Sequence, residues 1–164
     1  MLQVVEQHLT PIPPTGHELR AARLANVLAR AVRDGEVASA DALRVIRHEL
    51  RRRNTNKKLL IETRSRRAQA VIDQYGAASV PKNGSSDALH ADHVYPLTTE
   101  TLHRTDTVEK WIAELDTIQM VVCVTAEENY RLLMIEKAGV TGPDKYAKAA
   151  VEFITEDLPW RSGD

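Results

Sequence analysis

Three side chains capable of metal or acid–base chemistry stand close together in the segment HADHVYPL, residues 90–97: His90, Asp92 and His93. An aspartate oxygen suits a hard divalent cation such as Mg2+ or Mn2+. A neutral imidazole beside that cation can accept a proton from water near neutral pH. A metal ion and a base together suit phosphodiester hydrolysis, because the metal stabilises the phosphate and the leaving oxygen. The segment therefore indicates either such a site or, more simply, a polar strand edge.

The segment is expected to form a short strand that ends near Pro96. Successive side chains of a strand point to opposite faces, so His90 and Asp92 share a face whereas Asp92 and His93 do not. Asp92 and His93 reach one site only if the strand ends, bulges or turns there. A further oxygen or nitrogen ligand must come from elsewhere in the chain.

A second segment with suitable side chains is VVCVTAEENYRL, residues 121–132, whose pattern is a strand followed at once by a helix. Asn129 lies in the first helical turn and could offer its carbonyl oxygen to a metal held by Asp92. An ordinary surface asparagine is the alternative. Cys123, the single cysteine, lies in the apolar run and is expected to be a buried small hydrophobic residue.

Together the two segments resemble the HNH nucleases, the ββα-metal or His-Me finger group. HADHVYPL is similar to the family's D-x-D-H strand with its following proline, and His90 stands where an acidic residue is often found. VVCVTAEENYRL is similar to the strand and helix start that carry the family's later asparagine. The resemblance covers roughly residues 87–137.

This resemblance implies a role for each polar residue. Asp92 would be a metal ligand, His93 the general base and Asn129 a second protein ligand of one Mg2+ or Mn2+ ion. His90 would be a further candidate ligand, and Arg131 a candidate phosphate contact. The fold expected is α+β and mostly helical, with a small ββα-metal core and an N-terminal helical region.

A stripe of basic residues covers the segment from residue 44 to residue 67, which holds ten Lys or Arg and two acidic residues. On helices, several of them share a face at three- and four-residue spacing. Phosphate backbones bind such arrays with a steep salt dependence. A solvated face, or pairing with the acidic second half, is the alternative. The basic stripe consists of Arg44, Arg47, Arg51, Arg52, Arg53, Lys57, Lys58, Arg64, Arg66 and Arg67.

Charge is distributed unevenly between the two halves of the chain. Residues 1–86 carry 15 Lys or Arg and 8 Asp or Glu, a net charge of +7. Residues 87–164 carry 7 and 15, a net charge of −8. Such asymmetry points to a polyanionic partner for the basic half. Taken with the resemblance to HNH nucleases, it leads us to expect double-stranded DNA as that partner.

Hydrophobic periodicity and turn residues divide the chain into elements. We expect a helical, DNA-contacting basic region over 1–76, a linker or surface loop over 77–88, an HNH-like nuclease domain over 87–155 and a tail over 156–164. The individual elements predicted are helices over 17–35, 39–54, 55–76, 105–118, 126–139 and 141–154, and strands over 89–97 and 119–125.

The chain shows no apolar run approaching the roughly 20 residues that span a bilayer. Its beginning lacks the basic and then apolar pattern of a secretory signal. With a single cysteine there is no disulfide framework and no CxxC pair for a structural zinc. A cytoplasmic location without membrane contact is therefore expected.

The function expected from these features is metal-dependent hydrolysis of DNA by an HNH-type endonuclease. No asparagine lies between His93 and Asn129, where the family carries a middle one. That departure, with His90 in place of an acid, keeps open a catalytically inactive HNH-like accessory protein of a phage or mobile element that binds DNA without cutting it. A helical protein-interaction module with a basic face is a further alternative.

Overall fold

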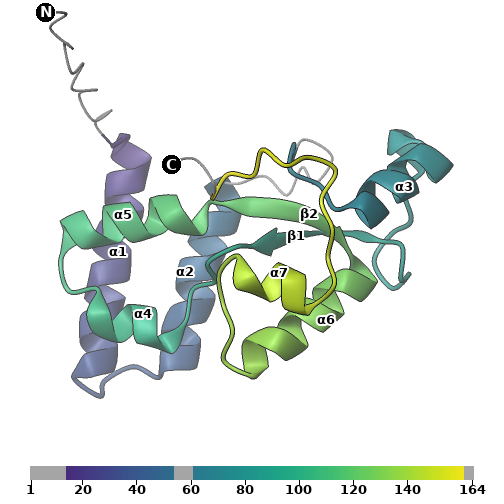
Figure 1. The fold of residues 1–164 in the computed structure, drawn as a ribbon. Helices are drawn as coiled ribbons and strands as arrows, with labels where there is room; N and C mark the ends of the chain where they lie inside the picture. Colours follow the sequence, from purple (N-terminus) through teal and green to yellow (C-terminus); the bar gives the residue numbers. More distant parts are fainter. Residues whose placement is uncertain (1–13, 54–60, 161–164) are drawn as a thin grey trace, which may run out of the picture.

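The structure, a computed structural model, describes residues 14–53 and 61–160, and the side chains of residues 50–53 fall outside that description. Helices dominate, and they surround two short strands (Figure 1). The elements in chain order are α1 (Gly16–Arg33), α2 (Ser39–Arg53), α3 (Arg66–Tyr75), a 3₁₀ turn (Ala77–Ser79), β1 (Leu89–His93), α4 (Thr99–Arg104), α5 (Val108–Ile118), β2 (Val121–Thr125), α6 (Ala126–Lys137) and α7 (Asp144–Lys148).

The sheet is built from β1 and β2, which pair antiparallel with Asp92 opposite Val122. The edge of β2 that does not pair with β1 is covered by residues 63–65. There the Ser65 amide donates to the Cys123 carbonyl at 2.9 Å, and the Cys123 amide donates to the Thr63 carbonyl at 2.9 Å. Residues 152–154 in turn pair with residues 64–66. β2 therefore has backbone partners on both sides, β1 on one and residues 63–65 on the other.

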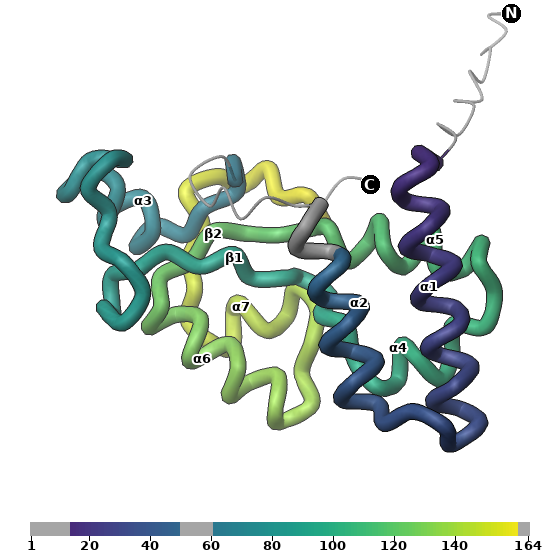
Figure 2. Tube along the Cα trace, turned by 180° about the vertical axis from the view of Figure 1, so that it is seen from behind, coloured from purple at the N-terminus to yellow at the C-terminus, as the bar shows by residue number. Residues whose placement is uncertain are grey.

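A layer of four helices lies beside the sheet. α1 and α2 pack against α4 and α5, the two helices that the chain inserts between β1 and β2 (Figures 1 and 2). Small residues on the inner face of α1, Ala22, Ala25 and Ala29, are almost fully buried and allow close approach of the helices. Trp111 of α5 is fully buried in the same apolar cluster. Side chains between residues 21 and 46 therefore share one core with side chains between residues 97 and 118.

The remaining helices cover the sheet itself. Val122 and Val124 of β2 pack with Leu132 of α6 and with residues of α7. On the opposite face Leu89 and Cys123 pack with α3. Two antiparallel strands followed directly by a helix thus form the centre of this region. The coarse prediction of a mostly helical α+β fold is confirmed.

The structure corrects two predicted helices. The third begins at Arg66 and not at residue 55, because Ser65 caps it and residues 63–65 bond to β2. The last is only Asp144–Lys148, because Ala150 has a φ of 54° and residues 152–154 join the sheet edge. Helix α4 was not predicted. Residues 54–60 of the predicted third helix lie outside the described part of the chain.

Cys123 is fully buried, as expected. Within the described residues, no helix combines the length and the apolarity that crossing a membrane requires.

Candidate functional site

Asp92 and His93 occupy the end of β1 and face opposite sides of the sheet. The ladder stays regular to the last residue, where His93 pairs with Val121, so the side chains alternate. Asp92 is 6% exposed and faces α6 and α7, whereas the His93 side chain is exposed. Because β1 ends at His93, that residue stands where the chain leaves the sheet.

The Asp92 carboxylate is held by two side chains of α7. Tyr146 donates from Oη to Asp92 Oδ2 at 2.6 Å, and Lys145 Nζ lies 3.0 Å from the same oxygen. Lys145 is completely buried, and it also donates to Glu136 Oε1 of α6 and to the His93 carbonyl, both at 2.6 Å. These four residues, Asp92, Glu136, Lys145 and Tyr146, form what we call the Lys145 cluster, which joins β1, α6 and α7.

The cluster limits how Asp92 can bind a metal. The Lys145 ammonium already supplies one positive charge to Oδ2, which opposes a second cation at that oxygen. Among the described residues no hydrogen bond reaches Oδ1, and a carboxylate offers about four acceptor sites in all. No group of three or more His, Cys, Asp or Glu within the described part of the chain could hold a metal. Asp92 can therefore contribute one oxygen, Oδ1, to a metal site whose other ligands include groups besides His, Cys, Asp and Glu.

Asn129 is the side chain that could complete it. Thr125, which caps α6, pairs with Leu89 at the start of β1, so β1 and α6 run from the same end of the sheet (Figure 1). Asn129 stands seven residues before Glu136, which puts both on one face of α6, about 10 Å apart along the axis. Glu136 contacts Lys145 of α7, so Asn129 lies on the same flank of α6 as that contact. The Asn129 side chain is half-buried.

His90 and Arg131 flank this region. By strand alternation His90 shares the sheet face of Asp92, and its side chain is half-buried. Arg131 of α6 has two buried nitrogens, Nε and Nη2, without a hydrogen-bond partner among the described residues. Only the remaining guanidinium nitrogen of Arg131, Nη1, is therefore left to contact a phosphate.

The basic stripe is only partly described. Arg51, Arg52 and Arg53 lie in the last turn of α2, but their side chains are outside the description, as are Lys57 and Lys58 entirely. The described members each have a partner within the chain: Arg44 with Asp41, Arg47 with the Leu97 carbonyl, Arg64 with the Ile61 carbonyl and Gln69, Arg66 with Glu152, and Arg67 with Glu127.

Two of these contacts are ion pairs between the basic and the acidic half. Arg67 Nη1 lies 2.6 Å from Glu127, and Arg66 Nε lies 3.5 Å from Glu152. Both arginine side chains remain more than half exposed, at 55% and 68%. Exposed pairs of this kind contribute little and exchange readily, so these arginines stay accessible to an anion.

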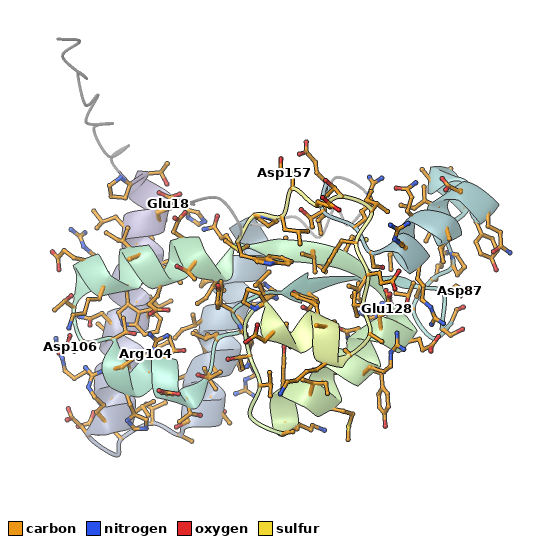
Figure 3. The ribbon with its side chains drawn as sticks, viewed as in Figure 1. Glu18, Asp87, Arg104, Asp106, Glu128 and Asp157 are labelled. Atoms are coloured by element: carbon orange, nitrogen blue, oxygen red, sulfur yellow. The ribbon has the colours of Figure 1, made fainter. Side chains whose placement is uncertain are left out.

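Sequence reasoning missed the residues that join the elements around the site. Glu128 is 1% exposed, and its Oε2 accepts from the Ser65 hydroxyl at 2.6 Å and from the Thr125 amide at 2.9 Å (Figure 3). The Ser65 hydroxyl accepts from the Ala68 amide, so one carboxylate connects the N-terminal caps of α3 and α6. The T-x-x-E pattern of residues 125–128 is a capping-box signal that could have identified Glu128. Nothing in the sequence marked Lys145 as buried.

Tyr146 gives the cluster a measurable pH dependence. Burial, together with the nearby Asp92 charge, raises the pKa of the Tyr146 hydroxyl above its ordinary value of 10.0. Above pH 10 the unfolded chain therefore loses this proton while the folded chain keeps it, so stability falls as pH rises.

We expect the free energy of unfolding to fall more steeply with pH above 10 in the wild type than in Tyr146→Phe, by up to about 1.4 kcal/mol per pH unit. Urea titrations at intervals from pH 8 to strongly alkaline conditions measure both slopes. Parallel slopes would show that Tyr146 does not hold its proton in the folded state.

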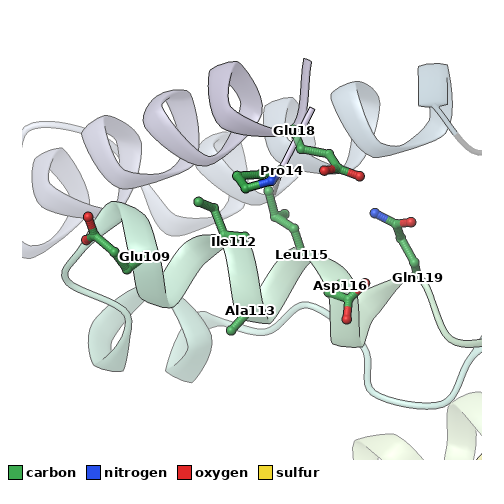
Figure 4. A pocket seen from close by; sticks show the side chains of 8 residues that line it. All are labelled: Pro14, Glu18, Glu109, Ile112, Ala113, Leu115, Asp116 and Gln119. Atoms are coloured by element: carbon green, nitrogen blue, oxygen red, sulfur yellow. The ribbon is translucent and has the colours of Figure 1, made fainter. Parts of the chain in front are cut away.

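The described surface also contains a cavity of about 450 Å³ between the start of α1 and α5 (Figure 4). Three carboxylate side chains line it, from Glu18, Glu109 and Asp116. Its lining includes no residue of β1, β2 or α6, so this cavity is separate from Asp92 and His93.

The chain was compared with protein-family models, with curated proteins and with solved structures, and none of them matches it. The geometry of its own residues therefore carries the functional argument.

Proposed function

We propose that the protein is a metal-dependent DNA endonuclease of the HNH type. The observation that carries the proposal is the antiparallel pair β1 and β2, which are joined through α4 and α5 and followed directly after β2 by α6. In this order Asp92 and His93 close the first strand, and Asn129 stands early on the helix that packs against it.

His93 is proposed as the general base. Its side chain is exposed at the end of β1, where water and a phosphate can approach it. A neutral imidazole can take a proton from an attacking water. The Lys145 contact is made to the backbone carbonyl of His93 and fixes the chain at this point.

The metal ligands proposed are Asp92 Oδ1 and the carbonyl oxygen of Asn129, with His90 as a further candidate. Both oxygens are hard donors of the kind that Mg2+ and Mn2+ accept. A bound ion would stabilise the charge of the scissile phosphate and of the leaving oxygen. Tyr146 and Lys145 would orient Asp92 through its other oxygen, Oδ2.

The basic stripe is proposed to bind the DNA backbone. Arg66 and Arg67 begin α3 and are more than half exposed, and Arg131 would contact a phosphate only through its remaining nitrogen. Binding through such contacts releases counterions, so affinity should fall steeply as salt rises. The other proposed contacts are Arg47, Arg51, Arg52, Arg53, Lys57, Lys58 and Arg64.

A nicking assay tests the proposal. With Mg2+ or Mn2+ we expect the protein to convert supercoiled plasmid to relaxed circles or linear DNA. Removing the ion with EDTA should abolish the conversion, and adding it back should restore it, because the metal neutralises the phosphate. If plasmid, single strands and branched DNA all stay intact with either ion, nuclease activity is refuted. Cleavage that EDTA does not affect would refute the proposed metal dependence.

A second function is favoured by one observation, the buried Lys145 ammonium 3.0 Å from Asp92. This ion pair balances the carboxylate without a metal, which suits a protein that binds DNA and does not cut it. Calorimetry separates the two proposals, because the nuclease should bind Mg2+ or Mn2+ and lose that binding in Asp92→Asn. DNA binding that depends steeply on salt, without metal binding, would favour the non-cutting protein. Absent or salt-insensitive DNA binding would favour a protein-interaction module.

A further inference from the structure

Helix α6 carries apolar side chains on the face that points away from the sheet. Tyr130, Leu133 and Met134 are 66%, 45% and 49% exposed. Their spacing of three and four residues makes them neighbours on the helix surface. We call these three residues the outer patch of α6.

The opposite face of α6 is already used by the core. Leu132 is fully buried and Glu128 nearly so, and both face the sheet region. A helix that covers a sheet is normally polar on its outer side, and single exposed apolar residues need no explanation. Three adjacent ones opposite a buried face indicate a surface that another molecule covers.

The charges at the ends of the outer patch identify the partner. Glu127 precedes the patch and Lys137 follows it, both are exposed, and they lie about 15 Å apart along the helix. The patch and the charge pair are both centred on the level of Leu132. Two copies of α6 that pack antiparallel about that level would place Glu127 of each copy against Lys137 of the other.

The same arrangement matches the apolar residues. Tyr130 of one copy would face Met134 of the second, and the two Leu133 side chains would meet near the two-fold axis. A parallel arrangement would instead set Glu127 against Glu127 and Lys137 against Lys137. From this self-complementarity we propose that the outer patch of α6 forms a symmetric dimer with a second copy of the chain.

Arg67 already contacts Glu127 Oε2 within one chain, at 2.6 Å. This contact is compatible with the dimer, because a carboxylate accepts several hydrogen bonds. In this contact the Glu127 side chain lies at the edge of the outer patch, where the second copy would meet it. The dimer would form whether or not the protein cuts DNA.

Exchange of the two charges tests the dimer directly. We expect sedimentation equilibrium to show a dimer for the wild type and dimerisation weakened roughly tenfold in Glu127→Lys and in Lys137→Glu, because each variant sets like charges together twice. A mixture of the two variants should recover the dimer, since every contact then joins opposite charges. Leu133→Glu should be monomeric.

Val27→Glu is the matched control, because Val27 is a 60% exposed apolar residue on α1 and its replacement should leave the dimer intact. Circular dichroism of each variant separates lost dimerisation from lost folding. A wild type that is monomeric at every concentration, whether alone or while binding vesicles or another protein, would overturn the inference. A dimer that survives Leu133→Glu, or a mixture no tighter than the single variants, would overturn it as well.

Discussion

Replacing His93 with alanine is expected to slow plasmid nicking by about 10²- to 10⁴-fold, the usual contribution of a general base. The reason is that His93 is the exposed imidazole at the end of the strand that carries Asp92. Folding should be preserved, because Lys145 bonds to the backbone carbonyl of His93 and that carbonyl remains in the variant.

His103→Ala is the matched control for this variant. His103 is also an exposed histidine, on α4, in the helical layer beside the sheet. Initial nicking rates of the wild type and both variants, at saturating Mn2+ and several pH values, separate base catalysis from binding. Equal rates for the wild type and His93→Ala would exclude His93 as the base, even if the protein cuts DNA.

The Lys145→Met variant is expected to lose about 3–5 kcal/mol of unfolding free energy. Methionine fills a similar volume but carries no charge, so Asp92 and Glu136 would remain in the interior without their shared cation. The Lys145 side chain is fully buried, and the two carboxylate side chains are only 7% and 18% exposed. Urea titration of the purified variant measures this loss.

Two further variants make this result specific. Lys148→Met changes an exposed lysine of the same helix and should alter the unfolding free energy by less than about 0.5 kcal/mol. In the Lys145→Met background, Asp92→Asn should recover part of the loss, because it removes one of the two uncompensated charges. If Lys145→Met were as stable as the wild type, the cluster would not hold β1, α6 and α7 together.

Local sequence patterns predicted the elements whose signal lies in consecutive residues. The apolar repeat of residues 17–35 and the β-branched run of residues 119–125 led to α1 and β2, since periodicity and side-chain shape are local properties. The apolar setting of Cys123 likewise predicted its burial. Each of these properties depends on neighbouring residues in the sequence and not on distant segments of the chain.

The errors occurred where a distant segment competes with local preference. Residues 61–65 continue a plausible helical pattern, but residues 63–65 bond to Cys123 of β2, some 60 positions along the chain. The predicted last helix is cut short in the same way by the pairing of residues 152–154 with residues 64–66. Backbone hydrogen bonds to a distant strand outweighed helix propensity, which differs by only a fraction of a kcal/mol per residue.

The candidate site likewise has features that the local sequence predicted and features that depend on distant segments. The sequence by itself determined which residue types could do chemistry, and it placed Asp92 and His93 on a strand and Asn129 at the start of a helix. Only the tertiary structure decided that Tyr146 and Lys145 bind the Asp92 carboxylate and that Lys145 also binds Glu136. It also decided that the His93 side chain is exposed on the other face of the sheet. Burial of a charge depends on what packs around it, and those neighbours come from β1, α6 and α7 together.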